Sequence, residues 1–162
     1  MHDNSGPCAF GDDENVKMTL GFLCSKLSNH FLSVLNPTLH YQIGNIASLP
    51  IINSTQNFSR RIIETAITFS QSDWNAYETS WDFTNMPLLN PENRQPILKD
   101  TYHNLRSDWQ ATTQEMQRLE EENNCIFIEA YGLQDELTPE VPLKEITLTC
   151  NPHYRYGGKK NR

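Results

Sequence analysis

The stretch LKDTYHNLRSDWQATTQEMQRLEEENNCIFIEAYG, residues 98–132, decides the fold of this chain. Bulky or apolar residues return in it at alternating steps of four and three, which places them in a heptad seam along one helix face. The acidic run 120–122 would be unfavourable at the negative end of a helix, whereas Gly132 is a natural C-cap. We therefore predict one long helix over 98–132. Its seam consists of Leu98, Tyr102, Leu105, Trp109, Thr112, Met116, Leu119, Asn123 and Ile126.

Two further helices are predicted on the N-terminal side of this segment. The first covers 16–35 and is stopped by Asn36-Pro37, because the residue before a proline disfavours helix. The second covers 59–70. Their apolar faces are Val16, Leu20, Leu23, Leu27, Phe31 and Leu35 in the first, and Ile62, Ile63, Ala66 and Phe69 in the second.

Period-two alternation predicts two short extended segments. Leu39, Tyr41 and Ile43 alternate with polar residues up to Gly44, and a helical turn or loop should follow. Residues 146–150 alternate in the same way and indicate a half-buried strand. Between the helices, residues 86–96 contain three prolines and are predicted to be an irregular connector.

These elements predict a mainly α fold with minor β, with one long heptad-patterned helix and short strands. We divide it into four parts. They are 1–54, a helix plus an extended segment; 55–97, a short helix, an aromatic elbow and a Pro-rich connector; 98–132, the long helix; and 133–162, a loop, strand and basic tail.

The composition indicates an ordinary cytoplasmic domain. The chain has 162 residues and a net charge of −7, which is enough length for one core. Its four cysteines form no C-x-x-C pair and its histidines have no ligand spacing, so we expect no metal and free thiols in a reducing cytosol. No apolar run is long enough to span a bilayer, and we expect no membrane association.

Charge is spread unevenly. Four of the thirteen Lys/Arg follow Tyr154, so nine Lys/Arg and twenty Asp/Glu leave the rest of the chain at −11. An acidic body is a poor free-standing phosphate binder. If the chain contacts DNA, its cations on helix faces and in the tail are the candidates. We name Lys17, Lys26, Arg60, Arg61, Arg155, Lys159 and Lys160.

An aromatic elbow, SDWNAYETSWDF, occupies residues 72–83. Ser72 and Asp73 are good helix caps, and Trp74, Tyr77, Trp81 and Phe83 follow within ten residues. Such rings can stack on nucleobases, but their acidic setting favours burial in a core.

The elbow and two other blocks resemble adenine-specific DNA methyltransferases of the PglX type from BREX phage-defence systems, and related type II/IIG restriction-modification enzymes. The other blocks are LGFLCSKLSNHFLSVLNPTLHYQIGNIASLPI at 20–51 and EENNCIFIEAYGLQDELTPEVPLKEITLTCNPHYRYGG at 121–158. Such enzymes transfer a methyl group from S-adenosylmethionine to the exocyclic amine of an adenine that is flipped out of the duplex.

The resemblance implies that the chain is an internal fragment. It would be a helical specificity or spacer region that covers the post-catalytic region, the helical spacer and the start of target recognition. In it, 1–54 would be the end of the catalytic or specificity module, 98–132 the long spacer helix, and 133–162 the segment that leads to a missing target-recognition domain. The family's cofactor-binding strand-turn and its Asn-Pro-Pro-aromatic motif both precede these blocks. We therefore expect no bound cofactor, no activity of the chain alone, and two partners: double-stranded DNA and the remaining domains of the methyltransferase.

Two alternatives remain open. Asn151-Pro152-His153-Tyr154 imitates the catalytic tetrad, but His153 replaces the second proline, and we interpret the segment as a strand end and turn. The heptad seam could instead belong to an independent helical interaction module that recruits a partner or a second copy. Thr112 and Asn123 in the seam favour packing within one protein over dimerisation.

Overall fold

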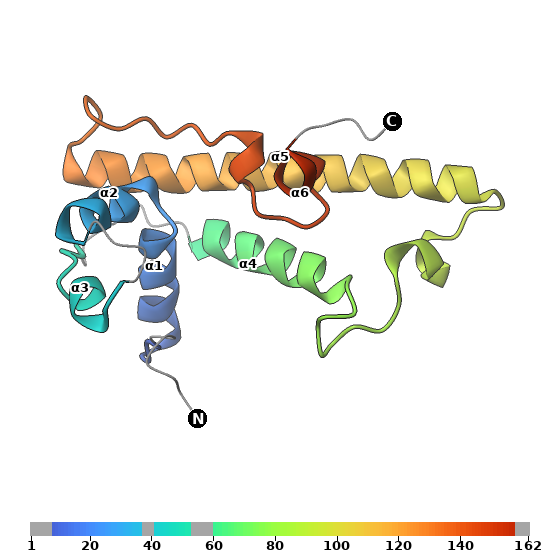
Figure 1. The fold of residues 1–162 in the computed structure, drawn as a ribbon, viewed down its shortest axis with the longest axis horizontal. Helices are drawn as coiled ribbons and strands as arrows, with labels where there is room; N and C mark the ends of the chain where they lie inside the picture. Colours follow the sequence, from blue (N-terminus) through green and yellow to red (C-terminus); the bar gives the residue numbers. More distant parts are fainter. Residues whose placement is uncertain (1–7, 37–40, 53–59, 158–162) are drawn as a thin grey trace. The chain divides into compact units, whose positions relative to one another are not determined.

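A computed structural model describes residues 8–36, 41–52 and 60–157 (Figure 1). Within these ranges the regular structure is helical and no strand occurs, so the mainly α prediction is confirmed and the minor β part is not observed. The α-helices are α1 (Asp13–Leu23), α2 (Lys26–Leu35), α3 (Ile43–Ala47), α4 (Arg60–Asn75), α5 (Leu98–Tyr131) and α6 (Pro152–Tyr156). Single 3-10 turns are η1 (Pro87–Leu89), η2 (Pro91–Asn93) and η3 (Leu143–Glu145).

The long helix α5 confirms the prediction from the heptad seam. It has 34 residues and ends where Gly132 takes a left-handed φ of 68°. The amide of Gly132 donates to the Glu129 carbonyl, and that of Leu133 donates to the Ile128 carbonyl, both at 3.1 Å. This pair of bonds is a Schellman cap, which requires the conformation that glycine adopts at low cost.

The helix predicted over 16–35 is wrong as a single element, because the chain breaks at Ser25. The Ser25 hydroxyl donates to the Phe22 carbonyl at 2.6 Å and accepts from the Ser28 amide at 3.3 Å. It thereby ends α1 and caps α2. The break changes which residues point inward. Phe22, Leu27 and Leu32 are buried, whereas Val16, Leu20 and Leu35 of the predicted stripe are exposed.

The extended segment predicted up to Gly44 is also wrong in its described part. Residues 37–40 lie outside the described ranges, and Ile43 already opens α3 after the extended residue Gln42. The helical turn expected before Leu49 is therefore present but begins earlier.

The second predicted helix is confirmed and is longer than expected. As α4 it continues to Asn75, past Ser72 and Asp73, which are consequently helix residues and not caps. The connector 86–96 is irregular as predicted. Its prolines Pro87 and Pro91 each open a 3-10 turn, where a missing N–H costs nothing.

The strand predicted over 146–150 is wrong, although its alternation in burial is real. Ile146 and Leu148 are buried and Thr147 is exposed, but no second strand pairs with the segment in the described part of the chain. The two apolar side chains fill a core beside α5, and backbone pairing is not needed for that.

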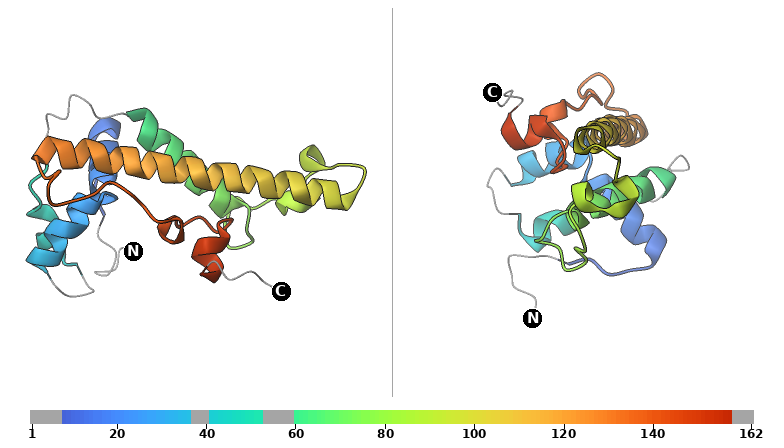
Figure 2. Two further views of the ribbon diagram at one scale, coloured as in Figure 1. Left: turned by 90° about the horizontal axis from the view of Figure 1, so that it is seen from above. Right: turned by 90° about the vertical axis from the view of Figure 1, so that its right-hand side faces the viewer.

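The chain divides into two compact units, and both α4 and α5 contribute residues to each. Unit 1 comprises residues 1–64 and 121–140, and unit 2 comprises residues 65–120 and 141–162. Within each unit the segment that follows Gly132 runs back along α5, as the two views in Figures 1 and 2 show. In unit 1 the Asn124 amide donates to the Pro139 carbonyl at 3.0 Å, and in unit 2 Gln117 donates to the Val141 carbonyl at 2.6 Å.

The core of unit 1 is built around an aromatic group. Phe22 meets Phe127 edge to face with ring centroids 5.5 Å apart, and Tyr131 stacks on Phe22 at 6.0 Å. The Tyr131 hydroxyl donates to the Pro50 carbonyl and accepts from the Ile52 amide at 3.1 Å. The buried members of this core are Phe22, Leu27, Leu32, Leu49 and Phe127.

Asn123, a polar position of the heptad seam, is buried in unit 1. Its amide donates to the Gly21 carbonyl at 2.9 Å. Because this buried side-chain amide has a hydrogen-bond partner, its burial is tolerated. The bond also fixes α5 against α1 at this position. The close approach needs a glycine, because a Cβ on Gly21 would lie 2.8 Å from the Ile63 Cδ1.

Unit 2 has a smaller core made of Met116, Val141, Ile146 and Leu148, with Ala66, Phe69 and Cys150 packed against it. None of the described helices is long and apolar enough to cross a membrane.

Candidate nucleic-acid interface

The two units differ in charge. Unit 1 contains four Lys/Arg and eleven Asp/Glu, which leaves it at −7, whereas unit 2 contains nine of each and is neutral. The whole net charge of the chain therefore lies in unit 1. A polyanion such as DNA is repelled by unit 1 and is not repelled by the net charge of unit 2.

Two of the candidate cations are held in a compact ion-pair cluster in unit 1. Lys17 lies 2.8 Å from both Asp13 and Glu64, and Arg60 lies 2.7 Å from Asp13 and 2.6 Å from Glu64. Hydrogen bonds from Lys17 and from Arg60 lower the pKa of Glu64 to about 2. The four charges cancel, so Lys17 and Arg60 can reach a phosphate only by leaving their carboxylates.

The other candidates of unit 1 are Lys26 and Arg61. The Lys26 ammonium donates to the Glu140 carbonyl, and its backbone amide donates to Asn124 at 2.9 Å. Arg61 is exposed on α4. The structure brings Lys17 and Arg60 together but gives Lys26 a separate, architectural role.

Unit 2 holds the remaining candidates. Arg155 is exposed on α6, and its guanidinium carbon lies 5.4 Å from the ring centre of Tyr77 and 5.7 Å from that of Tyr156. Lys159 and Lys160 lie outside the described residues. Arg155 is therefore a candidate cation without an acidic partner within ion-pair distance among the described residues.

Asp73 joins the end of α4 to the segment before α6, a role that the sequence analysis missed. Its carboxylate accepts from the Thr149 amide at 2.6 Å and from the Cys150 amide at 2.9 Å. Burial and the neighbouring Asp73 charge raise the pKa of the Cys150 thiol to about 11. No local signal could have identified this contact, because Thr149 and Cys150 lie 76 and 77 positions after Asp73 in the sequence.

The prediction that the elbow aromatics are core residues is wrong for both tryptophans. Trp74 is 56% exposed and Trp81 is wholly exposed, while Tyr77 and Phe83 are half-buried. For Trp74, the cause is the length of α4. Ala66, Phe69 and Asp73 are spaced by three and four residues and share its inner face, so Trp74 is turned outward by one residue's rotation.

Asn151 is a structural residue. It is 0% exposed, and its amide donates to the carbonyls of Leu143 at 2.7 Å and Ile146 at 2.8 Å. Its side-chain oxygen accepts from the His153 amide at 3.0 Å and caps α6. The turn interpretation of Asn151-Pro152-His153-Tyr154 agrees with this geometry, although a helix follows and no strand precedes it. Every hydrogen-bonding group of Asn151 that could hold an adenine amine is occupied by backbone.

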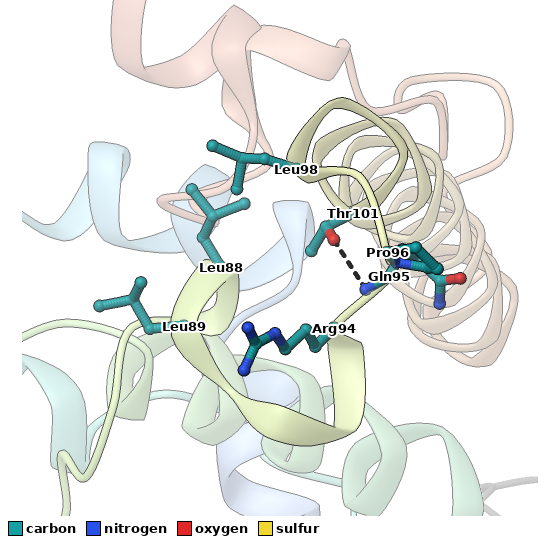
Figure 3. Close-up of a pocket in the computed structure, with 7 residues that line it drawn as sticks. All are labelled: Leu88, Leu89, Arg94, Gln95, Pro96, Leu98 and Thr101. Carbon is teal, nitrogen blue, oxygen red and sulfur yellow. Dashed lines mark hydrogen bonds between the residues drawn. The ribbon is translucent and has the colours of Figure 1, made fainter.

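A hollow of about 430 Å³ lies between the 3-10 turns and the start of α5 (Figure 3). The Gln95 amide donates to the Thr101 hydroxyl at 2.9 Å on one side, and the Arg94 side chain extends toward the leucines of η1. Its one ionisable side chain is that of Arg94, so the lining offers no acid–base pair. The lining residues are Leu88, Leu89, Arg94, Gln95, Pro96, Leu98 and Thr101. Across the described ranges, no group of three His, Cys, Asp or Glu side chains is arranged to hold a metal ion.

Glu120, on α5 in unit 2, has the most strongly raised acid pKa in the described chain. Burial and, after it, the charge of Glu145 raise its pKa from 4.5 to about 7. Between pH 4.5 and about 7, the folded state therefore keeps a proton on Glu120 that the unfolded chain has released. The stability that this proton on Glu120 gives the folded state is present in full below pH 4.5 and is lost as the pH rises through about 7.

We expect Glu120→Gln to raise the free energy of unfolding at pH 8 by about 1–2 kcal/mol, a figure reduced because solvent screens this half-buried group. Below pH 4.5 the variant and the parent should be equally stable. Urea unfolding at pH 4.5, 6 and 8 measures the difference. Glu78→Gln, an exposed glutamate of the same unit, is the control and should be neutral. A stability gain that is the same at every pH would contradict the prediction.

The comparisons with known proteins agree with the resemblance of the three sequence blocks. Over 152 residues the chain is 32% identical to the adenine-specific methyltransferase PglX of Lacticaseibacillus casei strain Zhang, covering 91% of this chain and 13% of that protein. The chain is related to PglX-type methyltransferases. The adenine-specific methyltransferase BrxX of Escherichia coli strain HS is 29% identical over 160 residues, covering 97% of this chain and 13% of that relative.

The alignments with the PglX-type enzymes span nearly all of this chain, so they include both units and the whole of α5. The chain corresponds to 13% of the length of each curated relative. No protein-family model matches the chain.

Proposed function

We propose that this chain works inside a site-specific adenine DNA methyltransferase of a phage-defence or restriction-modification system, such as BREX. It supplies the helical spacer and part of the DNA-facing architecture, and it acts in the cytoplasm. S-adenosylmethionine and the target adenine are bound by other domains, which together with double-stranded DNA are its partners. The observation that carries the proposal is the similarity to PglX and BrxX over 91% and 97% of the chain.

The DNA-facing surface of this proposal lies in unit 2. Arg155 is exposed there, and Lys159 and Lys160 follow it in a segment without Asp or Glu. The cations of unit 1 sit in an acidic unit, and Lys17 and Arg60 are already neutralised by Asp13 and Glu64. The charge difference between the units therefore ranks Arg155, Lys159 and Lys160 above Lys17, Lys26, Arg60 and Arg61 as phosphate contacts.

The alternative, an interaction module that recruits a partner through the heptad seam, has less support. Met116 of the seam packs within unit 2 against Ile146 and Leu148, and Asn123 bonds Gly21 within unit 1. A partner would have to displace these contacts. Only the first seam residues of α5, Leu98 and Tyr102, leave large side chains exposed.

Duplex-DNA binding by the purified chain, measured as a function of salt, tests the proposal. We expect the logarithm of the affinity to fall linearly with the logarithm of salt concentration. Replacing Arg155, Lys159 and Lys160 together with alanine should reduce that slope by about one unit for each phosphate that is no longer neutralised. The matched triple replacement of Lys17, Arg60 and Arg61 in unit 1 should leave the slope unchanged.

Two results would contradict the proposal. Binding that is absent, combined with a defined dimer in size-exclusion chromatography with mass detection, would favour the interaction module. Transfer of a methyl group from S-adenosylmethionine to DNA by the purified chain would show that the chain itself is catalytic, contrary to the architectural role proposed for it.

A further inference from the structure

The first turns of α5, in unit 2, carry a row of exposed hydrogen-bond donors to which the proposed function assigns no role (the yellow end of α5 in Figure 1). An α-helix turns about 100° per residue, so residues spaced by three, four and seven positions share one side of it. Thr101 and Leu105, on the opposite side, are buried. We call the exposed row the donor face of α5. It consists of Lys99, Tyr102, His103, Arg106 and Gln110.

Contacts between neighbouring side chains connect the donor face. The Arg106 guanidinium donates to the Tyr102 hydroxyl at 3.4 Å, and the rings of Tyr102 and His103 meet edge to face with centroids 6.1 Å apart. Tyr102 nevertheless remains 44% exposed. A guanidinium has five N–H donors, so its bond to one hydroxyl leaves most of the donors of Arg106 for a ligand.

Lys99 and Arg106 lack the acidic neighbours that neutralise other helical cations of this chain. Lys17, Arg60 and Arg118 each pair with an Asp or Glu three or four positions away on the same helix, at 2.8, 2.6 and 2.8 Å. The residues three and four positions from Lys99 and from Arg106 include no Asp or Glu. Over the described ranges neither of these two cations has an ion-pair partner, so their charges are not cancelled on the helix.

The chemistry of the donor face favours a nucleic-acid backbone over a protein as its ligand. Lysine, arginine, tyrosine and glutamine side chains are among those that contact phosphate oxygens. The face contains no aliphatic side chain, whereas the centre of a protein–protein interface is mostly apolar. Asp100 and Asp108, the acids of these turns, point about 100° and 180° away from Lys99. A phosphate chain on this face therefore meets donors and no carboxylate.

We propose that the donor face of α5 binds the phosphate backbone of duplex DNA, with Lys99 and Arg106 each neutralising one phosphate. This proposal rests on the proposed DNA-facing role of unit 2 and adds contacts on a second helix. Lys99 and Arg106 are separated by about 10 Å along the helix axis, at 1.5 Å per residue. Successive phosphates of one strand advance by about 3.4 Å along the duplex, so the two cations reach different phosphates.

The salt dependence of duplex-DNA binding tests the proposal, with the duplex used for the test of the proposed function. Lys99→Ala combined with Arg106→Ala should lower the slope of log affinity against log salt by about two units, because each lost phosphate contact contributes about 0.9. Arg106→Lys keeps the charge and should keep the slope. Alanine is the strongest helix former, so we expect α5 to be retained, and circular dichroism of every variant verifies this.

Arg118→Ala is the matched control. Arg118 is also exposed on α5 in unit 2, and its loss changes the net charge by the same amount as the loss of Arg106, but Glu115 already holds its guanidinium at 2.8 Å. We expect this control to change the slope by less than about 0.3 units, against about 0.9 for Arg106→Ala alone. Equal changes for the two variants would reflect net charge only and would overturn the proposal.

The triple replacement of Arg155, Lys159 and Lys160 separates this proposal from the proposed function. A slope that falls for the triple variant and is unchanged for the double variant would overturn the donor face and leave the DNA-facing role of unit 2 intact. Absence of DNA binding by the parent chain would overturn both. If the double variant changed only the mass measured in size-exclusion chromatography, the donor face would be a protein contact and the proposal would be wrong.

Discussion

Replacing Phe127 with alanine is expected to lower the free energy of unfolding by about 3–5 kcal/mol, the largest stability effect we expect in unit 1. Phe127 is 2% exposed and packs edge to face on Phe22 with ring centroids 5.5 Å apart. Alanine removes both the buried ring and this contact, and it leaves a cavity between α1, α2 and the end of α5. The surrounding rings cannot close the cavity without breaking their own contacts.

Chemical denaturation monitored by circular dichroism measures this effect. The matched control is Phe10→Ala, because Phe10 belongs to the same unit but is 86% exposed. We expect the control to change stability by less than about 0.5 kcal/mol. A loss below about 1 kcal/mol for Phe127→Ala would show that this aromatic group does not form the core of unit 1.

The second large effect is expected at Asn151 in unit 2. Asn151→Ala should cost about 2–4 kcal/mol of unfolding free energy. The substitution leaves the Leu143 and Ile146 carbonyls without their donor and removes the cap of α6 at the His153 amide. Buried polar groups without partners are costly because they lose water and gain nothing in return.

Asn151→Asp sharpens the test. The aspartate keeps the capping oxygen but brings a negative charge against two carbonyl oxygens, so we expect a greater loss than for alanine at pH 7, with recovery as the carboxyl is protonated at low pH. Asn104→Ala, at an exposed position of α5, is the control and should be neutral. If Asn151→Ala left stability unchanged, the structural role of this amide would be wrong, and its likeness to a catalytic motif would need a new explanation.

The two units differ in charge and in the aromatic side chains that they contain. Unit 1 contains the aromatic core, the whole net negative charge and an ion-pair cluster that neutralises two of its cations. Unit 2 is neutral and exposes aromatic rings beside Arg155. In the function proposed here, unit 1 serves as architecture and unit 2 faces the DNA.

The sequence by itself determined the elements whose evidence is local. The heptad period and Gly132 predicted α5 and its end, the apolar face of 62–69 predicted α4, and three prolines predicted the irregular connector. Helical periodicity relates residues three or four positions apart, and caps act within one turn, so both can be read without the rest of the molecule. The amino-acid sequences of three blocks also predicted the relation to PglX-type methyltransferases.

Tertiary structure alone decided which polar side chains already have partners and which aromatic side chains are exposed. Lys17 and Arg60 are neutralised by carboxylates up to 47 positions away, and Asp73 binds amides more than 70 positions away. The alternation at 146–150 became two buried side chains without a strand, because α5 offered a packing surface and no backbone ladder. Trp74 is exposed because the inner face of α4 continues through Asp73. Such outcomes depend on what covers a residue, and the covering segments are distant in sequence.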